Sequence, residues 1–163
     1  MRSHLVPLIA ALLAATPALH AEEVDVSAAA SLQDALRTIA ATYEQRTGDR
    51  VVFNFGASST LAMQIRAGAP VDVFFSADEA KIDSVAIVPG TRRTLLSNTL
   101  VVVANRPLRA PRDLVRMKRI AIAEPSSVPA GIYARQWLQR LGLWQEVLPR
   151  VIPTADVRAA LAR

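Results

Sequence analysis

The chain of 163 residues contains no cysteine, and its only two histidines are His4 and His20. Beyond residue 21 the sequence therefore offers neither a thiol nor an imidazole, which excludes side-chain catalysis by either group. Without cysteine, no disulfide can support the fold. Stability must come from the burial of apolar side chains, and a hydrophobic content of 52% is ample for that.

Aromatic residues are also scarce, at 5% of the chain, so the sequence lacks the stacking platforms that nucleic-acid bases need. The formal net charge is +5, but the arginines are scattered and only the stretch 106–119 is locally dense. These features predict a basic, solvated surface rather than nucleic-acid binding.

The first 21 residues have the pattern of a secretory signal peptide. Arg2 precedes an apolar run at 5–19, and the small Ala21 precedes two charged residues. A transmembrane helix needs about 20 apolar residues, whereas this run is shorter and contains Pro7 and Pro17. We expect cleavage after Ala21 and export to the periplasm.

Strand-like and helix-like segments alternate along the rest of the chain. Strands are expected at 24–27, 51–55, 71–75, 100–104, 119–123 and 147–152, and helices at 31–47, 60–66, 132–141 and from 77 and 155 onward. The apolar run 100–104 has the character of a strand covered on both faces. This alternation implies a mainly parallel α/β sheet with helices on both faces, in which ligands bind at the carboxyl ends of the strands.

Three segments rich in small residues lie where a strand should pass into a helix. They are 28–31 (AAAS), 56–60 (GASST) and 129–131 (PAG). Hydroxyls and free backbone N–H groups at helix N-termini can hold an anion. Taken singly, a serine such as Ser31 is more often a helix cap, and Asp34 three residues later resembles a capping box. Both interpretations stay open from these residues alone.

Other chemistries fit the sequence poorly. It contains no phosphate-binding GxxxxGK[ST] or GxGxxG pattern and no GxSxG nucleophile motif. The carboxylates do not cluster; Asp72 and Asp78 flank a strand end, where a helix cap and a surface charge are the common roles. We expect no enzymatic activity, no cofactor and no metal held by protein side chains.

Four motifs in the same order resemble the periplasmic molybdate-binding proteins of ABC importers, the ModA family. They are 26–32 (VSAAASL), 55–61 (FGASSTL), 68–78 (GAPVDVFFSAD) and 128–134 (VPAGIYA). The segments 142–144 (GLW) and 156–161 (DVRAAL) extend the likeness almost to the last residue. Four motifs in order are far more specific than any one of them.

The resemblance implies a type II-like periplasmic binding fold, in which two α/β lobes close on a molybdate or tungstate dianion. The lobes would span residues 22–96 and 97–163, after a signal peptide at 1–21. By motif alignment, molybdenum would be held only as the oxyanion, through hydroxyl and backbone N–H of Ser31 and Ser58 and through backbone N–H of Ala130 and Val157. The implied partners are the membrane permease and ATPase subunits of an ABC importer.

The sequence departs from the family pattern at its C-terminal end. It stops at Arg163, within the second lobe, before the family's tyrosine-bearing strand and the return to the first lobe. Neither Tyr43 nor Tyr133 is a candidate replacement for that tyrosine donor. The resemblance thus implies a truncated chain with an incomplete second lobe, expected not to bind molybdate well. A non-binding remnant or exported interaction domain is the alternative function.

Overall fold

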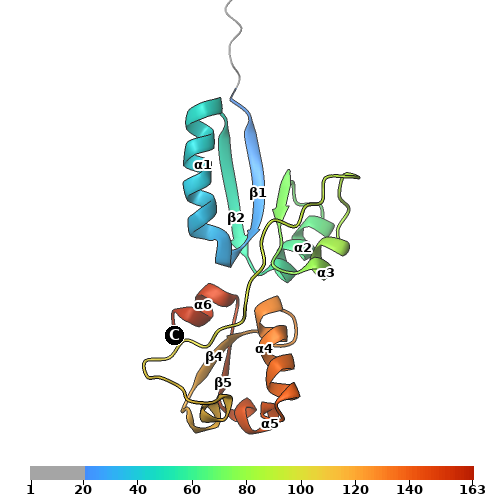
Figure 1. Cartoon of the computed structure of the whole chain (residues 1–163). Coiled ribbons are helices and arrows are strands. Elements are labelled where there is room, and N and C mark those ends of the chain that lie inside the picture. The colour runs from blue at the N-terminus through green and yellow to red at the C-terminus, as the bar shows by residue number, and fades with distance from the viewer. Residues whose placement is uncertain (1–20) are drawn as a thin grey trace, which may run out of the picture.

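The computed structural model describes residues 21–163, so the predicted signal peptide, apart from Ala21, lies outside the described residues. Two separate parallel β-sheets organise the chain, each with helices packed on it (Figure 1). Every strand pairing in both sheets is parallel, as the alternation of strands and helices predicts. Within the described part of the chain, no helix has the length and apolar character needed to cross a membrane.

The first lobe is built on a three-stranded sheet with β1 in the centre. The strand order is β2-β1-β3, formed by β2 (Arg50–Gly56), β1 (Glu23–Ala29) and β3 (Val73–Phe75). A 3₁₀ turn, η1 (Ala30–Leu32), leads from β1 into α1 (Gln33–Thr47), while α2 (Ser58–Arg66) follows β2 and α3 (Glu79–Asp83) follows β3. Gly48 ends α1 in the left-handed conformation, with φ of 82°.

The second lobe is built on two strands, β4 (Ile120–Ala123) and β5 (Val151–Thr154). The helical elements around them are η2 (Pro111–Arg116), α4 (Pro129–Arg140), α5 (Trp144–Val147), η3 (Leu148–Arg150) and α6 (Val157–Leu161). Leu114, Leu138 and Val147 form the centre of its apolar core. Burial of these side chains stabilises the lobe.

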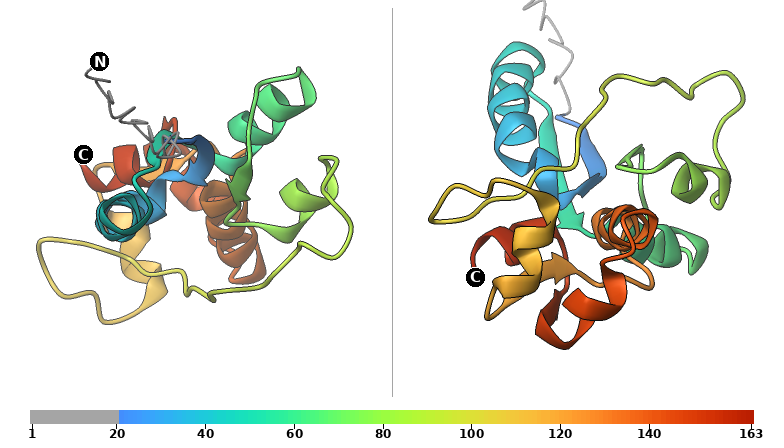
Figure 2. Two further views of the ribbon diagram at one scale, coloured as in Figure 1. Left: turned by 90° about the horizontal axis from the view of Figure 1, so that it is seen from above. Right: turned by 60° about the horizontal axis from the view of Figure 1, so that its bottom comes forward.

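The connection between the lobes, residues 84–110, contains no helix or strand. It runs as a long loop from α3 to η2, visible in yellow-green in the right-hand view of Figure 2. The strand predicted at 100–104 is therefore wrong. Val101 and Val103 are 72% and 71% exposed. An apolar run becomes a strand only where another strand edge supplies hydrogen-bond partners, and this run pairs with none.

The strand predicted at 147–152 is wrong in its first half. Val147 is fully buried as the last residue of α5, and the strand β5 begins only at Val151. The other predicted strands have counterparts in β1 to β4. The division at residues 96 and 97 lies inside the irregular connection and stays a prediction.

Candidate anion-binding site

The site predicted from the sequence lies where the two lobes meet. Figure 1 shows β1 and β2 ending at the lower edge of the first lobe, beside the start of α4 and beside α6 of the second. The elements η1 and α6 are in contact across this junction. The four predicted residues thus come from the starts of four helical elements, two in each lobe.

Ser31 lies in the 3₁₀ turn η1 with its side chain exposed. The hydrogen bond at the end of this turn runs from the Gln33 N–H to the Ala30 carbonyl. Ser31 is only the second residue of the turn, so its N–H lies among those that have no partner inside a helix. No side chain caps η1 or α1, and the capping box predicted for Ser31 and Asp34 is wrong. The 3₁₀ turn moves the start of α1 past Ser31, which leaves its hydroxyl free of a capping role.

Ser58 is the first residue of α2 and is buried, with 2% of its surface exposed. Its Oγ accepts a hydrogen bond from the Ala77 N–H at 3.0 Å. The hydroxyl hydrogen can still be donated, since a serine both donates and accepts. The ladder of α2 begins with the Leu61 N–H donating to the Ala57 carbonyl, so the Ser58 N–H is also available.

Ala130 lies in the first turn of α4. The Ile132 N–H donates to the Val128 carbonyl at 2.9 Å, so the Ala130 N–H precedes the first bond of this helix. The next residue, Gly131, fixes how closely α4 approaches the end of β4. A Cβ atom there would lie 2.0 Å from the Ala123 carbonyl oxygen, so only glycine permits this approach.

Val157 begins α6, and Asp156 caps that helix. The Asp156 Oδ1 accepts from the Ala159 N–H at 2.9 Å, and the Asp156 carbonyl accepts from the Ala160 N–H at 3.1 Å. These bonds leave the N–H of Val157 without a partner inside the helix. The exposed Val157 side chain has no polar atom, so any contact with an anion would come from its backbone.

Three of the four predicted residues, Ser31, Ala130 and Val157, lie on the lining of one cavity of about 1470 Å³, which extends from the junction over β4, β5 and the connecting loop at 100–105. Ser58 is not among its lining residues. The residue before it, Ala57, packs in an apolar cluster with Val128 and Ala130, which places the start of α2 against the start of α4. The structure therefore brings all four predicted segments to one junction.

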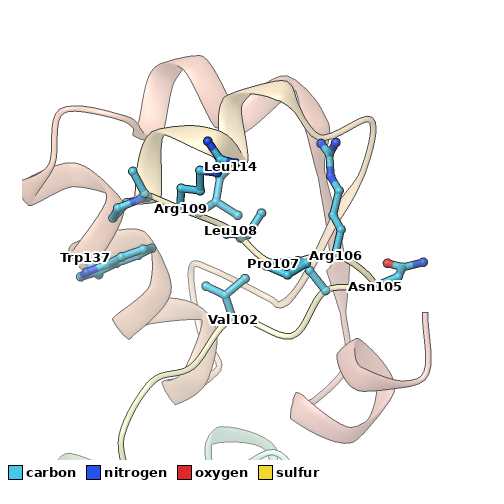
Figure 3. Close-up of a pocket in the computed structure, with 11 residues that line it drawn as sticks. Val102, Asn105, Arg106, Pro107, Leu108, Arg109, Leu114 and Trp137 are labelled. Carbon is cyan, nitrogen blue, oxygen red and sulfur yellow. The ribbon is translucent and has the colours of Figure 1, made fainter.

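A second cavity, of about 590 Å³, adjoins the first and shares Leu108, Leu114 and Trp137 with it (Figure 3). The connecting loop forms most of it, with Arg106, Leu108 and Arg109 on one side and Trp137 of α4 on another. None of the predicted anion-binding residues lines it. This cavity is formed mainly by the connecting loop and is not part of the predicted anion site.

Two carboxylates near the junction are engaged by partners from the opposite lobe. Asp34 accepts from Arg158 at 2.8 Å, and Asp78 accepts from the hydroxyl of Tyr133. The hydrogen bond to Asp78, with burial and the negative charges of Asp78 and Glu79, raises the pKa of Tyr133 to about 12. The phenol therefore stays protonated, and able to donate, at neutral pH.

The described residues contain no group of three or more His, Cys, Asp or Glu side chains placed to hold a metal ion. What converges at the junction is a set of hydroxyls and backbone N–H groups. Such donors suit a fully ionised anion, which offers acceptors and carries no proton.

Sequence reasoning missed three contributors to this arrangement: Ala77, the pair Tyr133 and Asp78, and the pair Arg158 and Asp34. Each acts across a long sequence separation, up to 124 residues for Arg158 and Asp34. Local patterns carry no signal for such contacts. Of the two carboxylates for which the sequence suggested a cap and a surface charge, Asp78 is the helix cap, since its Oδ1 accepts from the Lys81 N–H.

Comparison with known families identifies the chain. Residues 24–163 match the family described as bacterial extracellular solute-binding protein. The chain belongs to this family. A molybdate-binding protein ModA of Escherichia coli (strain K12) is 44% identical over 155 residues, which cover 86% of this chain and 60% of that protein. The resemblance to molybdate-binding proteins is thereby confirmed, and the family comprises solute-binding proteins rather than enzymes.

Two solved structures share the fold. The periplasmic molybdate-binding protein of Azotobacter vinelandii matches with a TM-score of 0.69 and 27% identity, over 85% of this chain and 65% of that one. The substrate-binding domain of a putative molybdenum ABC transporter from Clostridium difficile matches with a TM-score of 0.59 and 34% identity, over 87% and 66%. The predicted α/β periplasmic binding fold is confirmed, and the chain spans about three fifths of the length of its relatives.

Proposed function

We propose that this protein is the periplasmic substrate-binding component of an ABC importer and that its ligand is molybdate or tungstate. The anion would be held by hydroxyl and backbone N–H of Ser31 and Ser58 and by backbone N–H of Ala130 and Val157. The permease and ATPase subunits of the importer would be its partners, and residues 1–21 would direct its export.

One observation supports this proposal: four helical elements, two from each lobe, begin at one junction, and the backbone N–H of each predicted residue precedes the first hydrogen bond of its helix. Helix N-termini favour negative charge because their N–H groups are unsatisfied and their dipoles point the positive end outward. A tetrahedral dianion has four oxygen acceptors to match such a set. The names of the relatives support molybdate as the ion.

Isothermal titration of the purified chain with molybdate, tungstate and sulfate tests the proposal. The shortened sequence pattern predicts poor binding, but the structure brings all four predicted segments to one junction. We therefore expect saturable binding of molybdate and tungstate. Sulfate should bind much more weakly, because fixed donors cannot contract around the smaller ion. A chain that melts cooperatively but gives no heat with molybdate or tungstate would contradict the proposal. That outcome would favour the alternative of a non-binding remnant or exported interaction domain.

Export is tested separately, by mass spectrometry of a periplasmic extract. We expect a mature protein that begins at Glu22. An uncleaved chain held in the inner membrane would contradict export to the periplasm.

A further inference from the structure

Two polar contacts join the lobes in this structure. The Tyr133 hydroxyl on α4 donates to the Asp78 carboxylate before α3, and the Arg158 guanidinium on α6 donates to Asp34 Oδ2 on α1 at 2.8 Å. The remaining side-chain ion pairs among residues 21–163 stay within one lobe or the loop attached to it. These two contacts therefore differ in kind from the rest of the charged surface.

Both contacts are tied to the predicted anion-binding positions. Arg158 follows Val157 directly, and Asp34 lies about one helical turn after Ser31. On the other side, Tyr133 lies about one turn after Ala130 on α4. Asp78 follows Ala77, whose N–H donates to the Ser58 hydroxyl. Opening either contact would separate two predicted ligand segments.

In both contacts the acceptor and the donor come from the same respective lobes. Both carboxylates belong to the first lobe, and both donors belong to the second. An unpaired carboxylate beside the junction would repel a dianion. When the lobes close, Arg158 neutralises the charge of Asp34, and the Tyr133 hydroxyl gives Asp78 a hydrogen-bond donor. Closure therefore assembles the predicted donors and reduces the repulsion from Asp34.

From this geometry we propose that Tyr133–Asp78 and Arg158–Asp34 are two latches that hold the lobes closed and thereby set how slowly the anion leaves. The inference rests on the proposed function for its ligand and on the cross-lobe contacts for its mechanism. Tyr133 and Arg158 act as positioning residues, since their side chains bond to carboxylates of the opposite lobe.

The chain supplies a matched control for each latch. Tyr43 also donates its hydroxyl to a carboxylate, Asp49, at 2.8 Å, and it is 40% exposed, as is Tyr133. That contact lies within the first lobe. Likewise Arg50 pairs with Glu23 at 3.5 Å inside the first lobe. Tyr43→Phe and Arg50→Gln therefore repeat the chemistry of Tyr133→Phe and Arg158→Gln without touching the lobe junction.

The first measurement is the rate of molybdate binding and release by stopped-flow. In Tyr133→Phe we expect the dissociation rate to rise about tenfold with little change in association, as for the loss of a hydrogen bond to a charged group. In Arg158→Gln we expect a rise of roughly two- to fivefold, because the pair is exposed and screened by salt. The melting temperature without ligand should match that of each control.

The second measurement needs no ligand. Because the chain has no cysteine, spin labels can be attached at Ala41→Cys on α1 and Gln139→Cys on α4, both exposed positions in different lobes. Distances between the labels report lobe separation. We expect a broader and longer distribution in Tyr133→Phe and Arg158→Gln than in the parent or in either control.

The two measurements separate the possible failures. An unchanged distance distribution in both latch variants would overturn the latches, whether or not the parent binds molybdate. Equal dissociation rates in Tyr133→Phe and Tyr43→Phe would overturn the role of Tyr133 in release. A parent that binds no molybdate would overturn the proposed function, and the spin-label distances would then decide the latches on their own.

Discussion

The two serines predicted to contact the anion differ in burial and in hydrogen bonding. Ser31 is exposed in a 3₁₀ turn and caps no helix, whereas Ser58 is buried and accepts from the Ala77 N–H. A substitution at Ser31 therefore removes a donor to the ligand and little else. The same substitution at Ser58 also removes the hydrogen bond from the Ala77 N–H, which is part of the packing between the start of α2 and the segment before α3, and so costs free energy of folding.

Ser31→Ala and Ser58→Ala should both weaken molybdate binding, but only one should also destabilise the protein. Loss of a hydrogen bond to a charged group costs about 1.5–3 kcal/mol, or roughly one to two powers of ten in affinity. Ser58→Ala should in addition lower the free energy of unfolding by about 0.5–1.5 kcal/mol, the net contribution of its hydrogen bond with the Ala77 N–H. Titration calorimetry and urea denaturation measure the two effects.

The control for these serine variants is Ser84→Ala, since Ser84 is exposed and its hydroxyl bonds only to the Lys81 carbonyl near the end of α3. It should leave both affinity and stability unchanged. If Ser31→Ala and Ser58→Ala bind as tightly as Ser84→Ala, the anion site lies elsewhere.

Gly131 is a second position at which adding one carbon atom should change both stability and binding. Because its Cβ would lie 2.0 Å from the Ala123 carbonyl oxygen, Gly131→Ala should push α4 away from β4. Overpacking of this kind typically costs about 1–3 kcal/mol, and it should also displace the Ala130 N–H from the site. We expect a lower melting temperature and weaker molybdate binding.

Gly56→Ala is the control for this effect, because the added Cβ would meet only the Leu61 side chain at an ordinary 3.7 Å. It should change the melting temperature much less than Gly131→Ala. Equal effects of the two substitutions would mean that the close approach of α4 to β4 is not decisive.

Among the secondary-structure elements, a strand was predicted correctly only where the fold places another strand beside it. The β-branched runs before Gly56 and before Glu124 became β2 and β4 as expected. The equally apolar run 100–104 did not become a strand. An apolar composition indicates that burial would be favourable, but it does not show that a neighbouring strand edge is available for pairing. Val147 was misassigned because a buried valine at a helix end has the same local pattern as one in a strand.

The predicted anion site was also only partly readable from local sequence patterns. Small residues after strands indicated that Ser31, Ser58 and Ala130 occupy helix starts, and the structure places them there. The position of Val157 came from the family resemblance alone, because a valine after a capping aspartate looks like any helix start. Their role in binding the anion stays a prediction.

The exposed apolar run in the connecting loop should affect association more than folding. Val101 is 72% exposed, so Val101→Lys should change the free energy of unfolding by no more than about 0.5 kcal/mol. Removing part of an exposed apolar surface should reduce concentration-dependent association. Light scattering after size-exclusion chromatography, at rising protein concentration, measures the effect.

A different result is expected where the valine is buried. Val147→Lys, at a fully buried position of α5, should prevent folding of the second lobe. If Val101→Lys were as destabilising as Val147→Lys, the run would be packed in solution, contrary to its exposure in the structure.

For the molecule as a whole, the latches connect lobe closure to pH at the alkaline end. The folded-state pKa of Tyr133 is about 12, above its ordinary value of 10.0, because of Asp78 and burial. A group with a raised pKa contributes its full stabilisation below its unfolded value and loses it as the pH rises through its folded value. The Tyr133 contact should thus be complete below pH 10 and lost on approaching pH 12.

We therefore expect the distance between spin labels on Ala41→Cys and Gln139→Cys to lengthen between pH 10 and about 12. The lengthening should be absent in Tyr133→Phe, whose distribution should already be broad at neutral pH. Both measurements belong in a Tyr43→Phe background, because the pKa of Tyr43 is also raised, by its hydrogen bond to Asp49. A pH response that persists in Tyr133→Phe would contradict this assignment.

The arrangement of the two sheets also bears on the order in which the molecule folds. The first sheet uses only residues between Glu23 and Phe75, and the second only residues between Ile120 and Thr154. Each lobe therefore gains most of its contacts from one continuous stretch, which keeps the sequence separation of those contacts low and favours fast formation. The contact between Arg158 and Asp34 spans 124 residues and closes the longest loop among the ion pairs. Each lobe should thus reach its own structure first, and the junction between the lobes, with the proposed anion site, should be the last part of the protein to form.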